Sequence, residues 1–249
     1  MIKIEDVCKS FGEKKVLKHI NMEIKEGETL AIIGGSGSGK STLLRLLIGL
    51  DKPSSGEIYI MGRPVTQMTE AQWDEMRLDM GMVFQYSALF DSMSVGDNVA
   101  FALREHSDYS ENEISAIVAR KLEQVGLPGI QESMPGELSG GMKKRVGLAR
   151  AIAFDPKIIF YDEPSSGLDP ITTRTIDDLM IETQQKQKAT SVVVTHDMAS
   201  ACAIADRIAM IYEGELIAMD TVERFCQNRD KRVQSFMGRL YRGREQAEE

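Results

Sequence analysis

A glycine-rich run contains the residue types that bind phosphate groups in proteins. Its members fit the pattern GxxxxGK[ST] and are Gly34, Gly35, Ser36, Gly37, Ser38, Gly39, Lys40 and Ser41. Glycines let backbone N–H groups turn toward phosphate oxygens at a helix N-terminus. In such a loop Lys40 supplies a positive charge to the β- and γ-phosphates, and Ser41 offers its hydroxyl to Mg²⁺. Because a strand is predicted before the run and a helix after it, we favour this interpretation over a flexible turn with a solvated lysine.

An acidic pair, Asp162 and Glu163, follows the apolar run 158–161. In a doubly wound sheet, a carboxylate at the C-terminal end of a central strand lies beside the phosphate-binding loop. Asp162 is then expected to bind Mg²⁺, directly or through water, and Glu163 to polarise the attacking water as a general base. A pair of solvated carboxylates at a strand end is the simpler alternative. The phosphate-binding loop and the apolar run before the pair favour catalysis.

Two other polar residues also follow short apolar runs. Gln85 could bind Mg²⁺ or the attacking water, and it could move when phosphate leaves. His196 could donate a hydrogen bond to the γ-phosphate and orient Glu163. Either residue alone is more often a satisfied polar group in a turn. Near the N-terminus, Phe11 could stack on an adenine ring, or it could be an ordinary core aromatic.

A second glycine-rich element occupies residues 138–142, and its Ser139, Gly140 and Gly141 precede a helical pattern. Such a helix start forms another anion site. Because one ATP does not need two such sites from the same chain, we predict two copies packed head to tail. Each phosphate-binding loop would face the Ser139 region of the other copy, with ATP between them. Asp169 would then lie near the seam and couple the two sites. The alternative is a glycine-rich helix cap without a ligand.

The predicted elements alternate between strands and helices, which indicates an α/β fold. Strands are expected near residues 2–4, 16–24, 30–33, 57–61, 158–161 and 192–194, a hairpin around 213–214, and a helix over 42–50 that ends near residue 53. Between residues 87 and 156 strand signals vanish, which predicts an inserted helical subdomain. We therefore predict an ATP-binding core over 1–86 and 157–222, a helical subdomain over 87–156 and a C-terminal helical extension over 223–249.

Composition narrows the class of protein further. The chain has 38 acidic and 30 basic residues and a formal charge of −8, which disfavours nucleic acid as a partner. Its three cysteines, Cys8, Cys202 and Cys226, are too far apart in sequence for a metal cluster or a disulfide framework. The N-terminus lacks the apolar core of a signal peptide. No stretch approaches the roughly 20 apolar residues of a membrane span, so a transport role would need a separate membrane subunit.

The C-terminal region carries an apolar helical stripe. Its members recur at helical spacing and are Val233, Phe236, Met237, Leu240 and Tyr241. The flanking basic residues are Arg232, Arg239, Arg242 and Arg244. We favour a helix packed on its own domain. Docking on a partner ATPase and contact with anionic lipid head groups are the alternatives.

Together these motifs resemble those of the nucleotide-binding subunits of ATP-binding cassette (ABC) transporters. The resemblance covers residues 1 to about 222, in the family's order. It implies a P-loop ATPase core, an N-terminal antiparallel β-subdomain and the inserted helical subdomain, with ATP and Mg²⁺ as ligands. The implied assignments are Phe11 for adenine stacking, the phosphate loop from Gly34 to Thr42, Gln85 as Q-loop glutamine, Ser139, Gly140 and Gly141 as γ-phosphate ligands across the dimer, Asp162 and Glu163 as Walker B aspartate and base, Asp169 in the D-loop and His196 as switch histidine.

Two segments resemble the Mla/Mce-type phospholipid-transport ATPases more specifically. One is residues 88–95. The other is the second glycine-rich element, residues 138–142, which is the signature run of the family; Met142 stands there in place of the usual Gln. This resemblance implies a multi-helix permease, an MCE-domain substrate-binding protein and, in some systems, a STAS-domain subunit. It also implies a place on the cytoplasmic face of the inner membrane. An ATPase of an amino-acid or other small-molecule importer and a soluble ABC ATPase with an assembly role are the alternatives. A GTPase is disfavoured, because no guanine-reading NKxD run is present.

Overall fold

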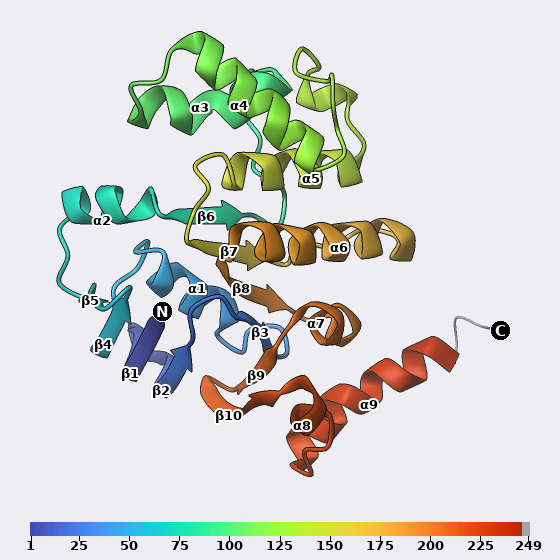
Figure 1. Cartoon of the computed structure of the whole chain (residues 1–249). Coiled ribbons are helices and arrows are strands. Elements are labelled where there is room, and N and C mark those ends of the chain that lie inside the picture. The colour runs from blue at the N-terminus through green and yellow to red at the C-terminus, as the bar shows by residue number, and fades with distance from the viewer. Residues whose placement is uncertain (246–249) are drawn as a thin grey trace. The chain divides into compact units, whose positions relative to one another are not determined.

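The computed structural model describes residues 1–245, and side chains are described for residues 1–238. The chain divides into two compact units. The first unit contains residues 1–73 and the chain from Val192 onward, and the second contains Asp74–Ser191. Figure 1 labels the elements of both units in chain order.

The first unit contains an antiparallel sheet near the N-terminus. Its strands follow the order β2-β1-β4-β5, and their bounds are β1 (Ile2–Phe11), β2 (Lys14–Ile24), β4 (Ser55–Ile60) and β5 (Arg63–Pro64). Apolar residues alternate along the strands, so that Ile2 and Ile4 are buried while Lys3 between them is exposed. This alternation places one face of the sheet against the core. The sheet is the antiparallel β-subdomain that the family resemblance predicts.

The first unit also contains strands of a second sheet, in the order β10-β9-β3-β8. Their bounds are β3 (Thr29–Ile33), β8 (Thr190–Thr195), β9 (Arg207–Tyr212) and β10 (Glu215–Thr221). Strands β3 and β9 are parallel, and β9 and β10 form the predicted hairpin. All residues of β3 are buried, as expected for a central strand with both faces covered. The chain enters this unit within β8, which begins at Thr190.

Helix α1 (Lys40–Leu47) follows β3, but its bounds differ from the prediction. The predicted helix runs over residues 42–50 and ends near residue 53. The observed helix starts two residues earlier and ends at Leu47, because Gly49 adopts a left-handed conformation with φ of 73°. A Cβ atom at Gly49 would lie 2.4 Å from the Trp73 ring. The ring therefore packs against the position where the helix ends.

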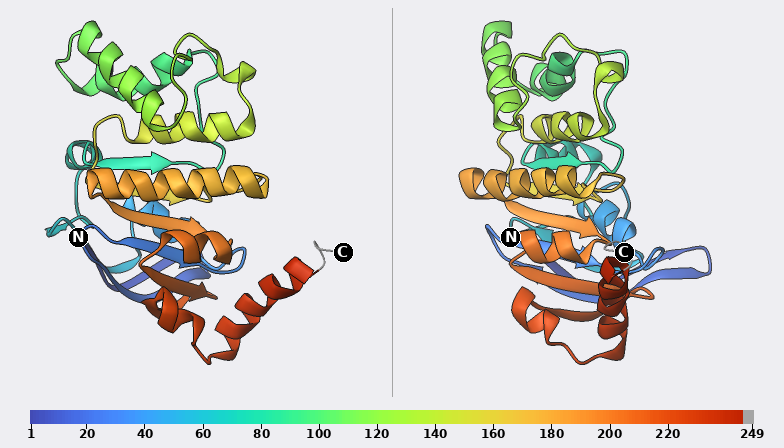
Figure 2. Two further views of the ribbon diagram at one scale, coloured as in Figure 1. Left: turned by 45° about the vertical axis from the view of Figure 1, so that its right-hand side comes forward. Right: turned by 90° about the vertical axis from the view of Figure 1, so that its right-hand side faces the viewer.

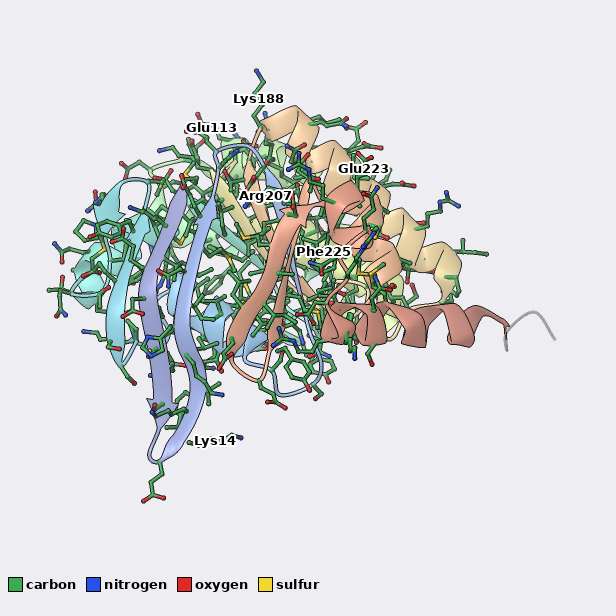
Figure 3. The ribbon with its side chains drawn as sticks, turned by 90° about the horizontal axis from the view of Figure 1, so that it is seen from below. Lys14, Glu113, Lys188, Arg207, Glu223 and Phe225 are labelled. Carbon is green, nitrogen blue, oxygen red and sulfur yellow. The ribbon has the colours of Figure 1, made fainter. Side chains whose placement is uncertain are left out.

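Three helices close the first unit: α7 (Met198–Ile204), α8 (Val222–Cys226) and α9 (Lys231–Glu245). Phe225 of α8 and Val233 of α9 are fully buried in one apolar cluster with residues of β3, β9 and α7. Phe225 points into the interior of its unit (Figure 3). Phe236 and Met237 pack against the same cluster. The start of the apolar stripe thus packs on its own domain, as predicted. The remaining predicted members, Leu240, Tyr241, Arg239, Arg242 and Arg244, lie outside the residues with described side chains.

The second unit contains two parallel strands and several helices. Its elements are the end of α2 (Glu70–Arg77), β6 (Met80–Val83), α3 (Val95–His106), α4 (Glu111–Gln124), the 3₁₀ helix η1 (Pro135–Glu137), α5 (Gly140–Ala151), β7 (Ile158–Asp162) and α6 (Pro170–Gln187). Figures 1 and 2 show α3, α4 and α5 grouped on one side of this unit, and α5 also contacts β6 and α6. A capping box of Ser110 and Glu113 opens α4.

The described segment from residue 87 to 156 contains helices and no strand. The compact units nevertheless divide elsewhere, because β6, β7 and α6 pack with these helices in the second unit. The subdomain boundaries expected from the sequence, at 86/87, 156/157 and 222/223, therefore stay a prediction.

Candidate functional site

The phosphate loop of the first unit connects the buried strand β3 to α1. Glycine is required at two of its positions by close approach. A Cβ atom at Gly34 would lie 2.2 Å from the carbonyl oxygen of Ile211, and one at Gly39 would lie 2.7 Å from a methyl carbon of Leu17. Gly39 also has a φ of 110°, which other residues rarely adopt. The loop backbone therefore passes directly against β9 and β2, and its shape is fixed by the strands around it.

A cavity of about 460 Å³ opens beside the loop and is strongly basic. Its lining residues come from the loop, the β1–β2 hairpin and the β9–β10 turn: Lys14, Lys15, Val16, Lys18, Gly37, Ser38, Gly39, Lys40, Ser41, Thr42, Glu213 and Gly214. In Figure 3, Lys14 lies at the tip of the hairpin. Four lysines and one carboxylate, that of Glu213, line the cavity, and Lys18 also lies 3.8 Å from Glu215. The remaining excess of positive charge favours a polyanionic ligand.

Two polar atoms of the loop test whether a phosphate group fits this cavity. The Lys40 ammonium donates hydrogen bonds to the carbonyl oxygens of Gly34 and Gly35, at 2.8 and 3.2 Å. The Ser38 hydroxyl is buried and has no hydrogen-bond partner among the described residues. A buried hydroxyl without a partner is costly unless a ligand satisfies it. A phosphate oxygen would satisfy it, and it would give Lys40 a stronger, charged acceptor.

Phe11 and His196 are the other predicted site residues in the first unit. Phe11 ends β1, opposite Lys14 in the strand register, and its side chain is 50% exposed. It is therefore not a core aromatic. The Lys9 ammonium lies 4.8 Å from its ring centroid, and Lys14, its register partner, lines the cavity. His196 is exposed and lies between the end of β8 and α7, whose N-cap is Asp197.

In the second unit, Gln85 and the acidic pair lie at the same edge of the parallel strands. Val83 and Tyr161 are register partners in β6 and β7, so Gln85 and Glu163 each come two residues beyond a paired position. The Gln85 side-chain amide donates to the Ser166 hydroxyl at 3.4 Å, and the Ser166 N–H donates to the Glu163 carbonyl at 3.1 Å. Ser166 thus joins the two predicted functional positions.

Glu163 is held in an unusual backbone conformation. Its φ is 47°, in the left-handed region that non-glycine residues adopt at a cost of about 1–2 kcal/mol. Such strain persists only where the surroundings enforce it, and it is common at functional sites. Asp162 is still the last residue of β7, whereas Glu163 follows the strand in this left-handed conformation. The two carboxylates of the pair therefore have different surroundings.

The second glycine-rich element forms the N-terminus of α5. Ser139 is the N-cap residue, and its hydroxyl accepts a hydrogen bond from the Met142 N–H at 3.3 Å. Both Ser139 and Gly140 are exposed. A Cβ atom at Gly141 would lie 2.6 Å from a methyl carbon of Thr172, so this glycine permits close packing of α5 on α6. The run therefore combines a solvent-facing helix start with a tight helix contact.

Asp169 is the N-cap residue of α6. Its carboxylate accepts hydrogen bonds from the N–H groups of Ile171 and Thr172, both at 3.0 Å, and from the Thr172 hydroxyl. The hydrogen bond from the Thr172 hydroxyl lowers the pKa of Asp169 most, and the bonds from the backbone N–H groups lower it further. The predicted seam residue is thus also a helix cap, which is a structural role within its own unit.

Each unit thus gathers a part of the predicted site. The first carries the phosphate loop, Phe11 and His196, and the second carries Gln85, the acidic pair, the signature run and Asp169. Sequence reasoning did not find the cavity lysines, Lys14, Lys15 and Lys18. Their only signal is a basic cluster just after Phe11, which resembles ordinary surface charge. Lys144 and Arg150, two cations of α5 that contact the Gln85 loop, were also missed.

A phosphate loop follows a central strand, and a separate signature run with the sequence LSGG, residues 138–141, lies at the start of α5. This combination defines the chain as a nucleotide-binding cassette. Residues 17–166 match the family model described as ABC transporter. The chain therefore belongs to the ABC transporter family, and it is an ATPase of that family. Within the described residues, no helix is both long enough and apolar enough for a membrane span.

Curated relatives and solved structures match nearly the whole chain. The intermembrane phospholipid transport system ATP-binding protein MlaF of Haemophilus influenzae is 42% identical over 95% of this chain and 90% of its own length. The Arabidopsis thaliana chloroplast protein TRIGALACTOSYLDIACYLGLYCEROL 3 is 40% identical over 95% and 73%. The methionine import protein MetN of Carboxydothermus hydrogenoformans is 45% identical over 83% and 61%. The dimeric cassette MJ0796 bound to ADP and Pi superposes with a TM-score of 0.82, at 34% identity over 89% of this chain and 99% of that chain.

Proposed function

We propose that this ATPase powers phospholipid transport between the inner and outer membranes as part of an Mla/Mce-type system. The observation that carries the proposal is its 42% identity to MlaF over 95% of the chain. A second relative is named for a galactosylated diacylglycerol, which is also a membrane lipid. The segment 88–95 and Met142 of the signature run, both typical of this branch, support the same substrate class.

The residues of the site have separate roles in ATP hydrolysis under this proposal. Phe11 stacks on adenine, the phosphate loop from Gly34 to Thr42 surrounds the phosphates, and Lys40 exchanges its carbonyl acceptors for phosphate oxygens. Glu163 is the general base that takes the proton of the attacking water. His196 donates a hydrogen bond to the γ-phosphate and orients Glu163.

Mg²⁺ is the proposed metal, and the oxygen donors of this chain fit it. Ser41, Gln85 and Asp162 supply a hydroxyl, an amide oxygen and a carboxylate, which are hard ligands of the kind that Mg²⁺ prefers. When bound, the ion neutralises negative charge that develops on the phosphate oxygens. Ser41 is the second residue of α1 and is exposed, so its hydroxyl is accessible from solvent.

A second copy of the chain completes each site. Ser139 and Gly140 are exposed at the start of a helix of 12 residues, so their N–H groups can bind the γ-phosphate of ATP held by the other copy. A similar cassette has been solved as a dimer, which supports the pairing of two copies. Gly141 contributes by letting α5 pack on α6 at short range.

A membrane permease is the proposed partner of the segment around Gln85. Aromatic side chains are unusually exposed there: Tyr86 at 86%, Phe90 at 43% and Phe101 at 38%. The Phe90 and Phe101 rings lie 5.0 Å apart, and the Arg150 guanidinium lies 6.0 Å from the Phe90 ring centroid. A clustered aromatic surface with a cation is typical of protein interfaces. A cavity of about 290 Å³ adjoins it, lined mainly by β6, α3 and α5.

The remaining partners follow from the family resemblance. They are an MCE-domain substrate-binding protein and, in some systems, a STAS-domain subunit. The chain would then lie on the cytoplasmic face of the inner membrane and attach to it through the permease. An amino-acid or other small-molecule importer is the second candidate, because MetN is 45% identical over 83% of this chain. The two candidates share every hydrolytic motif and differ in cargo and permease.

Affinity purification of the full chain in detergent tests the proposal. Mass spectrometry would identify the co-purified proteins and the bound small molecules. We expect a multi-helix permease with bound phospholipid. A permease without lipid but with an amino-acid-binding protein would favour the second candidate. The absence of any membrane partner would reject the transport role and favour a soluble assembly factor.

A further inference from the structure

Helix α5 binds the backbone of two functional loops through two cations, of which Lys144 is buried and Arg150 is half-buried. The Lys144 ammonium donates hydrogen bonds to the carbonyl oxygens of Gln85, at 2.5 Å, and Glu163, at 3.3 Å. Further along the same helix, the Arg150 guanidinium donates hydrogen bonds to the carbonyl oxygens of Ser87 and Ala88, at 2.8 and 2.7 Å. All these residues belong to the second unit.

Packing alone does not account for a lysine at position 144. Its side chain is buried, with 6% of the residue exposed. Burial lowers the pKa of Lys144, although the nearby carboxylates of Glu163 and Asp162 raise it. An apolar side chain of similar volume would avoid the cost of burying a charge. Burial of the ammonium therefore costs free energy, and its hydrogen bonds to the carbonyl oxygens of Gln85 and Glu163 explain why a lysine occupies this position.

The carbonyl groups that the cations bind belong to residues with a left-handed backbone conformation or, for Gln85, to a residue close to them in the same loop. Ser87, Ala88 and Glu163 have φ values of 61°, 46° and 47°, which are left-handed for non-glycine residues. Each costs about 1–2 kcal/mol and needs support from the surroundings. Lys144 and Arg150 give this support, since a cation is a stronger donor to a carbonyl than a neutral group. The direction of the Gln85 and Glu163 side chains depends on these backbone conformations.

The other end of α5 carries the signature run. Ser139 caps the helix, and Lys144 follows it by five residues within the same 12-residue element. A helix of this length moves as a rigid rod, so a displacement at Ser139 is carried to Lys144. The carbonyl oxygens of Gln85 and Glu163 would follow.

We propose that Lys144 is a positioning residue that links the signature end of α5 to Gln85 and Glu163 of the same chain. This inference rests on the proposed function, because it takes Glu163 as the base and Ser139 as a ligand of ATP on the second copy. ATP that is held by the second copy and bound at Ser139 would then set the positions of Glu163 and Gln85, which act on the ATP in the chain's own phosphate loop. The two ATP sites of the dimer would be coupled through Lys144.

Substitution at position 144 tests the link, with the full chain assayed for steady-state ATP hydrolysis and for binding of a fluorescent ATP analogue. Lys144→Met removes the charge and keeps the length, Lys144→Arg keeps a cation, and Lys143→Met is the matched control beside it. We expect kcat of Lys144→Met to fall roughly 10–100-fold, since small misplacements of catalytic groups have effects of this size. KM should change little, because Lys144 does not touch the nucleotide. The Hill coefficient should fall to about 1.

The other variants and a folding control make the result decisive. Lys144→Arg should restore most of kcat and the cooperativity, and Lys143→Met should match the parent chain. Urea unfolding reports whether Lys144→Met is folded; if it is not, Lys144→Gln takes its place under the same expectations. Parental kcat and Hill coefficient in the uncharged variant would overturn the link. Parental hydrolysis by Glu163→Gln would instead overturn the proposed roles in catalysis, which separates the two failures.

Discussion

At the scale of single residues, the phosphate loop keeps its conformation because glycines, which lack a Cβ atom, stand where a side chain would clash. Gly34 lies against the Ile211 carbonyl, whereas the neighbouring Gly35 is exposed and has open space around its Cα. The same motif therefore contains one glycine that the fold requires and one that it does not. The hydrogen bond from the Gly214 N–H to the Ser38 carbonyl, at 3.1 Å, also ties the loop to the β9–β10 turn.

Replacing these two glycines by alanine should separate their roles. Gly34→Ala places a methyl group 2.2 Å from a backbone oxygen, so we expect a loss of about 1–3 kcal/mol in the free energy of unfolding, as for overpacked sites. Gly35→Ala should change it by less than about 0.5 kcal/mol. Urea unfolding of both variants measures the difference. Equal stability of the two would contradict the packing described for Gly34.

Residue-scale features were predictable from the sequence only where they form a linear motif. Gly34 to Ser41 and Asp162-Glu163 are contiguous, and each follows an apolar run, so type and spacing are enough to find them. The contact of Lys144 with Gln85 joins residues 59 positions apart. The sequence shows only a basic residue in a helical pattern there, because nothing local distinguishes a buried lysine from a solvated one.

At the scale of elements, an ion pair between a buried lysine and a half-exposed carboxylate joins α4 to the turn before β7. The Lys121 side chain is fully buried, and its ammonium contacts the half-exposed carboxylate of Asp155 at 2.5 Å. Asp155 also accepts a hydrogen bond from the Gln187 side chain at 3.1 Å. Burial lowers the pKa of Lys121, and the Asp155 carboxylate offsets part of this effect. The pair therefore stabilises the position of α4 only while both members are present.

Removing either member should have unequal effects on stability. Asp155→Ala leaves the Lys121 ammonium buried without its carboxylate, and we expect a loss of about 1–3 kcal/mol, since Asp155 itself is partly solvated. Lys121→Met removes the charge and should change the free energy of unfolding by less than about 1 kcal/mol or increase it. Urea unfolding of both single variants and the double variant gives the coupling energy. A larger loss for Lys121→Met than for Asp155→Ala would show that this account is wrong.

The elements themselves were largely predictable, but their ends were not. The apolar runs located β3, β7 and the β9–β10 hairpin, because buried strands have a distinct composition. Helix α1 was placed two residues late at its start and three residues late at its end, since Gly49 and the Trp73 ring stop it before Pro53. That contact joins residues 24 positions apart in the sequence, so a local pattern cannot reveal it.

At the scale of the whole molecule, the proposed active unit is two copies of the chain. Under this proposal, each copy supplies a phosphate loop to one ATP and an exposed signature run to the other ATP. Blocking hydrolysis should therefore trap ATP and the dimer together. Glu163→Gln removes the base but leaves every proposed ATP ligand in place.

Sedimentation velocity and turnover of Glu163→Gln test this assembly. We expect a dimer in the presence of ATP and a monomer without it, with turnover lowered roughly 10²–10⁴-fold. Adding Ser139→Arg, which places a bulky cation at the signature helix start, should abolish the dimer but leave ATP binding to the phosphate loop. A dimer that forms without ATP, or that survives Ser139→Arg, would contradict the proposed seam.

Phospholipid transport is the central claim, and it can be measured directly with the detergent-purified complex of the chain and its co-purified permease. The complex is reconstituted into vesicles, and transfer of a fluorescent phospholipid to or from the protein-bearing membrane is followed with and without ATP. We predict ATP-dependent transfer by the parental chain and none by the Glu163→Gln chain. Parental transfer that ignores ATP, or ATP-driven uptake of an amino acid with no movement of phospholipid, would contradict the account.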